Sequence, residues 1–290
     1  MTGIAFLGAL ELGLIYAFVA LGVYLTFRVL DFPDLTVDGT FPLGAAVAAV
    51  LILGGWNPWL ATLAAAVAGA LAGLVTAFVT VRFRILHLLA GILTMIALFS
   101  INLRIMGRPN VAVLSQETVF TIGSQFPEHL ARPAVMALLV IAFVAVLWWI
   151  LSSEWGLALR ATGGNPRMAR SLGVGVNRHI MAGVAGSNAL VGIAGALFAQ
   201  ANGFADVTAG LGTIVVGLAA VIIGETLIGT RSLLVALVSC VFGSILYRLA
   251  VQFVLAADIP GVQASDLSLA TSVLVLAALV LPKLRRARTA

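Results

Sequence analysis

The segment SSEWGLALRATGGNPRMARSLGVGVNRH (152–179) is a long polar stretch in a chain that is otherwise mostly apolar. Apolar segments long enough to cross a bilayer precede and follow it. Four of the sixteen Lys and Arg residues lie within it: Arg160, Arg167, Arg170 and Arg178. The pattern predicts an aqueous loop between two membrane spans, and the loop is a candidate docking element for a partner protein.

The composition of the chain indicates a membrane protein. Hydrophobic residues make up 62% of the sequence and charged residues 9%, whereas globular domains are about half apolar and about a quarter charged. A hydrocarbon core of about 30 Å requires about 20 helical residues for each span. Such spans use up almost all of the 290 residues. We expect one all-α, polytopic transmembrane domain over residues 1–290 and no soluble catalytic domain.

Nine spans are expected. They cover residues 5–27, 34–54, 58–81, 86–106, 133–151, 180–202, 213–229, 232–255 and 267–281. The first of them lacks a preceding basic region and is too long for a typical signal peptide, so we interpret it as retained. The single cysteine, Cys240, lies inside a span and excludes an internal disulfide.

The distribution of basic residues predicts the orientation. The net charge is +5, but the charges lie in short loops between spans, which favours a topological role over binding of nucleic acid. With the tail 283–290 in the cytoplasm, twelve of the sixteen Lys and Arg residues lie inside. The other four are Arg104, Arg108, Arg132 and Arg248. The N-terminus is therefore expected outside and the C-terminus inside, with 152–179 cytoplasmic and 107–132 extracytoplasmic. The loop 107–132 is either a solvated connector or part of a landing platform for an extracytoplasmic protein.

Two segments resemble each other and suggest an inverted repeat. They read DFPDLTVDGTFPLG (31–44) and DVTAGLGTIVVG (206–217). Asp34 corresponds to Asp206, Thr36 to Thr208, Gly39-Thr40 to Gly212-Thr213, and Gly44 to Gly217, with one residue of slippage. The segments are five spans apart, so they enter the membrane from opposite faces. Chance similarity between sequences rich in Gly and Ala is the alternative.

The first of these segments is difficult to explain as an ordinary span. Asp31, Asp34 and Asp38 fall within eight residues, and Pro33 and Pro42 interrupt a helix. Carboxylates are costly in lipid, so the segment must face protein or a water-filled cavity. Discontinuous segments at matching positions of two repeats point to a translocation path. The residues expected along it are Asp34, Thr36, Asp38, Thr40, Asp206, Thr208 and Thr213. The alternative is that residues 31–38 form a cytoplasmic loop before a short span.

A short helix is expected within the segment 152–179. Asn165 suits the N-cap and Pro166 the first helical position. The helix would continue to Leu172, and Gly173 suits its end. Arg167 and Arg170 are three residues apart and share one face. The result is a basic helix of about two turns with glycine on either side.

These residues resemble a family motif. The motif is R-A-x-G-x-N-P-x-x-A-R-x-x-G-[VI]-x-[VI]-x-R, from permease subunits of bacterial ABC importers for branched-chain amino acids, ribose and related solutes. It is matched by Arg160-Ala161, Gly163, Asn165-Pro166, Ala169-Arg170, Gly173-Val174, Val176 and Arg178. The chain departs from it at Gly164, where the family often has Glu. The segment 32–45 is similar to the branch served by lipoprotein-type binding proteins for aromatic amino acids.

The resemblance implies a transport subunit of the bacterial inner membrane. Its expected partners are ABC ATPase subunits, an extracytoplasmic solute-binding protein, a second permease copy (identical or homologous) and the lipid bilayer. ATP and Mg would bind to the ATPase and no cofactor to this chain, which has one lysine and no P-loop motif. The residues expected to contact the ATPase are Arg160, Asn165, Pro166, Arg167, Arg170 and Gly173.

The solute and the energy source leave alternatives open. The resemblance favours an amino acid, and an aromatic one, although a permease for a sugar or nucleoside has the same motif. An ion-coupled secondary transporter would use Asp31, Asp34 and Asp38, or Glu11, as cation sites, but it needs no docking helix. A membrane enzyme is poorly supported, because the three histidines are scattered and no metal-ligand spacing occurs.

Overall fold

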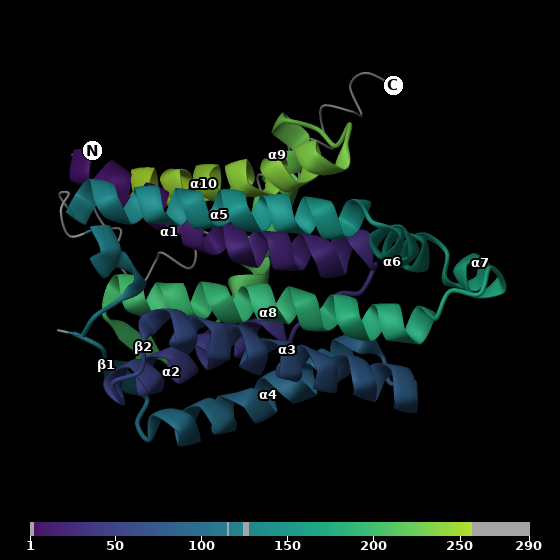
Figure 1. Ribbon diagram of the computed structural model, residues 1–290, viewed down its shortest axis with the longest axis horizontal. Coiled ribbons are helices and arrows are strands. Elements are labelled where there is room, and N and C mark those ends of the chain that lie inside the picture. Colours follow the sequence, from purple (N-terminus) through teal and green to yellow (C-terminus); the bar gives the residue numbers. More distant parts are fainter. Residues whose placement is uncertain (1–2, 115, 124–127, 257–290) are drawn as a thin grey trace.

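The computed structural model describes residues 3–114, 116–123 and 128–256 (Figure 1). Its α-helices are α1 (Gly3–Val23), α2 (Val37–Leu53), α3 (Pro58–Phe83), α4 (His87–Met106), α5 (Glu128–Ser152), α6 (Glu154–Gly164), α7 (Pro166–Ser171), α8 (Val176–Asn202), α9 (Thr213–Leu227) and α10 (Leu233–Ala256). A π-helical segment, η1 (Tyr24–Val29), continues α1, and a 3-10 helix, η2 (Val119–Gly123), precedes α5. Two short strands, β1 (Asn110–Ala112) and β2 (Phe204–Asp206), pair antiparallel.

The first eight expected spans each coincide with one helix. Six helices among the described residues are long and apolar enough to cross a membrane, whereas α2 and α9 are apolar helices of 17 and 15 residues. The protein is therefore a polytopic helical membrane protein. The ninth expected span, 267–281, and the tail 283–290 lie outside the described residues, so neither the total of nine nor the position of the C-terminus is tested.

The helices lie roughly along the long axis of the molecule, as Figure 1 shows. α6 and α7 are at one end, and β1 and β2 are at the other. α2 packs against α3 and α8, and α9 packs against α10 and α1. α1 and α8 contact each other and join the two groups. The two short apolar helices, α2 and α9, are therefore packed within the bundle.

Glycine allows α2 and α8 to approach closely. A Cβ atom on Gly44 would collide with the backbone of Gly192, and a Cβ on Gly195 would collide with the carbonyl of Phe41. Small residues let helix backbones approach in a bilayer, where packing and hydrogen bonds replace the hydrophobic effect. These glycines therefore fix the position of α2.

The chain between α1 and α2 turns back into the bundle. The π-helical turns end with backbone hydrogen bonds from Leu30 to Leu25 (3.1 Å) and from Phe32 to Thr26 (2.9 Å). Asp31 then takes a left-handed conformation, with φ at 52°, and Pro33 prevents the helix from continuing. This reversal directs residues 34–36 toward the interior.

Candidate functional site

The segment before α2 is buried between α3 and α8. Asp34 is only 2% exposed. Its Oδ1 accepts a hydrogen bond from the backbone N–H of Thr36 (2.9 Å), and its Oδ2 accepts one from Nδ2 of Asn188 (2.6 Å). The hydroxyls of Thr36 and Thr76 lie 2.8 Å apart, and Thr40 donates to Oδ1 of Asn188 (2.8 Å). Within residues 31–38, Asp31 is exposed and Pro33, Leu35 and Asp38 are partly buried, whereas the other four residues are buried.

The segment before α9 begins with the same local turn. Oδ1 of Asp206 accepts a hydrogen bond from the backbone N–H of Thr208 (2.7 Å), and Oδ2 accepts one from Asn110 (3.0 Å). Partial burial acts to raise the pKa of Asp206, but the hydrogen bonds from Thr208 and Asn110 outweigh it and hold the pKa below its usual value. Unlike the Thr36 side chain, that of Thr208 is exposed. The two Asp-x-Thr turns therefore share geometry and differ in surroundings.

The N-termini of α2 and α9 meet at Asp38. The carboxylate of Asp38, in the first turn of α2, accepts hydrogen bonds from the backbone N–H groups of Gly212 (3.2 Å) and Ile214 (2.7 Å). A Cβ atom on Gly210 would collide with the carbonyl of Asp38 and the ring of Pro42. A carboxylate at this position caps α9 and interacts favourably with the positive end of its helix dipole.

The expected path residues are therefore only partly brought together. Asp38 contacts the segment that leads into α9, whereas Asp34, Thr36 and Thr40 bond toward α3 and α8. Asp206 lies beside β1 through its bond to Asn110. The sequence predicts that the two segments correspond, and the structure adds that Asp38 joins them.

A cavity of about 310 Å³ lies beside this junction, between α2, α4 and the segment that leads into α9. We call it the α2–α4 cavity. It is lined by Asp38, Gly39, Pro42, Met95, Ile96, Phe99, Ser100, Asn102, Val207 and Leu211. Asn102 is fully buried and donates from Nδ2 to the carbonyl of Gly39 (3.2 Å). Its Oδ1 has no hydrogen-bond partner among the described residues.

The short helix expected in the segment 152–179 is confirmed as α7. Oδ1 of Asn165 accepts a hydrogen bond from the backbone N–H of Met168 (3.0 Å), and Pro166 is the first helical residue. Gly173 takes a φ of 83° just after the helix. Arg167 and Arg170 are exposed. Local capping chemistry therefore sets the form of this helix.

Two exposed apolar side chains accompany these arginines. Met168 is 60% exposed and Leu172 is 71% exposed. The sequence interpretation concentrated on the charges and missed this apolar pair. Exposed apolar residues among polar ones are typical of protein–protein contacts, so they add to the case for α7 as a candidate docking surface.

The helix α6 was also not expected, although its glycine has a clear role. A Cβ atom on Gly163 would collide with the carbonyl of Val29, so α6 approaches η1 closely. Arg160 of α6 lines a cavity of about 510 Å³ that also contains Arg28 and Arg231. Gly164 has open space around its Cβ position. Through this contact, α6 connects α7 to the end of α1.

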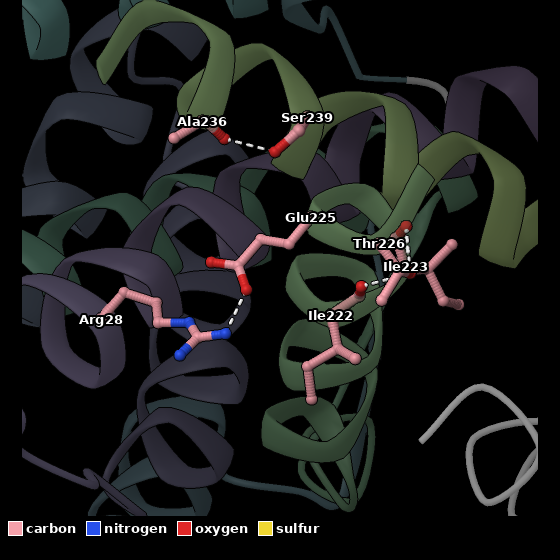
Figure 2. A network of polar contacts seen from close by, with 7 residues as sticks. All are labelled: Arg28, Ile222, Ile223, Glu225, Thr226, Ala236 and Ser239. Atoms are coloured by element: carbon pink, nitrogen blue, oxygen red, sulfur yellow. Dashed lines mark hydrogen bonds and ion pairs between the residues drawn. The ribbon is translucent and has the colours of Figure 1, made fainter. Parts of the chain in front are cut away.

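An ion pair joins η1 to α9 near the same end of the molecule. Figure 2 shows the guanidinium of Arg28 directed at the carboxylate of Glu225. Glu225 lies in the last turn of α9. Glu11, the cation site considered for an ion-coupled transporter, is partly buried, and its Oε1 has no hydrogen-bond partner among the described residues. The Arg28–Glu225 pair joins α9 to η1, and η1 in turn contacts α6 and α8, the two helices that flank α7.

Comparison with known proteins finds a matching family model and relatives that include permeases. The family model described as the permease component of branched-chain amino acid transport systems matches residues 5–281. A tyrosine transport system permease protein of Clostridioides difficile is 36% identical over 278 residues, which cover 96% of this chain and 90% of that protein. An uncharacterized protein of Rickettsia prowazekii is 38% identical over 252 residues, or 85% and 88% of the two chains. A nucleoside ABC transporter permease protein of Lactococcus lactis is 33% identical over 213 residues, or 65% of each chain. No solved structure matches.

Proposed function

The chain belongs to the family of permease components of branched-chain amino acid transport systems, and we propose that it carries an amino acid into the cytoplasm as a subunit of an ATP-driven importer. It is a multi-pass permease of an ABC transporter in the inner membrane. The observation that carries the proposal is the meeting of α2 and α9 at Asp38 inside a chain of this family. ATP and Mg would bind to a separate ATPase.

The translocation path would follow the two short helices. Helices that begin inside a membrane leave backbone groups and polar side chains near the middle, where a solute can meet them. Asp34, Thr36, Asp38 and Thr40 would line the part of the path next to α2. Asp206, Thr208 and Thr213 would line the part next to α9.

An inverted repeat accounts for this arrangement. Exchanging α1 with α8, α2 with α9 and α3 with α10 turns the packing of α2 on α3 and α8 into the packing of α9 on α10 and α1. The matching Asp-x-Thr turns support the same correspondence. Nine spans, with the N-terminus outside and the C-terminus inside, would complete the repeat.

The helix α7 would receive the movement of the ATPase. Arg167, Arg170, Met168 and Leu172 offer charged and apolar contacts on an exposed, capped helix. The contact between Gly163 and Val29 and the ion pair between Arg28 and Glu225 would pass a displacement to α9. A binding protein would dock at the other end, near the loop 107–132, and a second permease copy would complete the transporter.

The solute is proposed to be an aromatic amino acid. This rests on similarity to the tyrosine transport permease over 96% of the chain and on the motif at 32–45. A nucleoside is the second candidate, because the nucleoside permease is 33% identical over a shorter region. Whether the solute is an amino acid or a nucleoside depends on which side chains and backbone groups line the path.

The test is uptake by the purified complex in proteoliposomes, with the ATPase and binding protein of the same transport system. We expect accumulation of labelled tyrosine with ATP and Mg in the compartment that contains the ATPase, in the absence of an ion gradient. Excess nucleoside should not compete. Uptake that requires a sodium or proton gradient and proceeds without ATP would contradict the proposal, and uptake of nucleosides alone would replace the solute.

A further inference from the structure

One of the residues that line the α2–α4 cavity has a buried hydrogen-bond acceptor without a partner among the described residues. Asn102 is fully buried, and its Nδ2 is used by the carbonyl of Gly39 at 3.2 Å. This bond fixes the orientation of the amide, because the carbonyl can accept only from the nitrogen. Oδ1 is left without a hydrogen-bond partner among the described residues. An unpaired buried acceptor is costly, and more so inside a membrane, so it indicates a ligand with a hydrogen-bond donor.

The second polar group of the cavity is also an acceptor. Asp38 uses its two carboxylate oxygens to accept from Gly212 and Ile214, and each oxygen retains further acceptor capacity. No Lys, Arg or His is among the residues described as lining this cavity. A carboxylate and an amide oxygen on one cavity favour a donor that carries positive charge.

The remaining walls suit an apolar group of moderate size. Met95, Ile96 and Phe99 of α4 line the cavity together with the apolar residues Pro42 and Leu211. Its volume of about 310 Å³ is at the small end of the roughly 300–1,000 Å³ of ligand pockets. Phe and Met side chains make favourable contacts with aromatic rings. A single amino acid with an aromatic side chain supplies both a positively charged donor and an apolar group of this size.

We propose that the α2–α4 cavity is a subsite for the ammonium group of the solute, held by the Asp38 carboxylate and Oδ1 of Asn102, with the solute side chain against Met95 and Phe99. The inference rests on the proposed function and adds a binding site for the solute on its path. It also supplies a reason for excluding sugars and nucleosides, which have no primary ammonium group. Asn102 thereby becomes a binding residue and not only an interhelical contact.

The test uses a cysteine at Ser100, which is exposed and lines the cavity. Ser100→Cys is introduced with Cys240→Ala into the permease–ATPase complex in nanodiscs, and its reaction with a small water-soluble thiol reagent is followed. We expect tyrosine to slow the reaction. The deaminated analogue 3-(4-hydroxyphenyl)propionate and sodium chloride should not slow it.

Two substitutions separate ligand binding from packing. Asn102→Leu removes both the acceptor and the bond to Gly39, whereas Asn102→Asp loses the same bond and keeps an acceptor. Loss of a hydrogen bond to a charged group corresponds to roughly tenfold or more in affinity. The half-protecting concentration of tyrosine should rise by about that factor in Asn102→Leu and stay near the original value in Asn102→Asp. Asn202→Leu, outside the cavity, is the control.

The outcomes distinguish this inference from the proposed function. ATP-driven tyrosine uptake without protection at position 100, or equal protection by the deaminated analogue, would overturn the subsite and leave the permease role intact. Equal loss of protection in both Asn102 variants would assign a packing role alone. Protection by sodium without tyrosine would replace the ammonium with a metal cation. A cysteine at 100 that never reacts would also overturn the subsite.

Discussion

Asp34 and Asp38 are four residues apart, yet their surroundings give them different roles. Asp34 is buried and accepts hydrogen bonds from Thr36 and Asn188. These bonds hold the segment before α2 against α8. Asp38 instead bonds to the start of α9 and lines a cavity. Burial and satisfied bonds hold Asp34 in a fixed position beside the proposed path, whereas partial exposure leaves Asp38 able to meet a solute.

Removing Asn188 should destabilise the protein. Asn188→Ala takes away the donor to Asp34 and the acceptor for Thr40. Loss of one partner in a buried polar network costs about 2–4 kcal/mol, so we expect a clearly lower Tm in detergent. Thr76→Val, which removes only the hydroxyl beside Thr36, should cost about 1 kcal/mol. Equal Tm values for wild type and Asn188→Ala would show that the network does not hold α2 in place.

At the scale of the element, α7 is the helix that the sequence predicts most directly, because its capping groups are local. Asn165, Pro166 and Gly173 set its ends through bonds that span a few residues. The proposed contact with the ATPase is therefore made by its exposed face. Arg167→Glu with Arg170→Glu should abolish ATP-driven uptake and weaken association with the ATPase, measured by co-purification. Arg82→Glu, at an exposed position in the last turn of α3, is the control, and unchanged uptake in the double variant would remove α7 as the contact.

The ion pair between η1 and α9 offers a second test at this scale. Arg28→Glu or Glu225→Arg places like charges together, and either change should reduce ATP-driven uptake several-fold. The double exchange restores opposite charges and should recover part of the loss, because a charge pair is judged by its coupling and not by single substitutions. If the double variant is no better than the worse single variant, the pair does not connect η1 with α9 during transport.

The elements differ in how far the sequence predicts them. Hydropathy sets the long helices, so eight expected spans match helices within a few residues. The reversal at Asp31, the helix α6 and the capping of α9 by Asp38 depend on contacts between residues far apart in sequence. The unpaired oxygen of Asn102 also depends on such a contact, because it follows from the bond between the Asn102 nitrogen and the carbonyl of Gly39.

At the scale of the whole molecule, the proposed path requires that the two short helices, α2 and α9, enter the membrane from opposite faces. Asp31, before α2, lies toward the end that carries α6, and Thr208, before α9, follows β2 at the other end. Both side chains are exposed. This arrangement explains how Asp38 of one helix can cap the other.

The most direct test is labelling from each side of the membrane. Asp31→Cys and Thr208→Cys are made separately with Cys240→Ala, and a membrane-impermeant maleimide is added to right-side-out and to inside-out vesicles. The account predicts that Thr208→Cys reacts only in right-side-out vesicles and Asp31→Cys only in inside-out vesicles. Labelling of both cysteines from the same side would contradict the inverted arrangement of α2 and α9, and with it the proposed path.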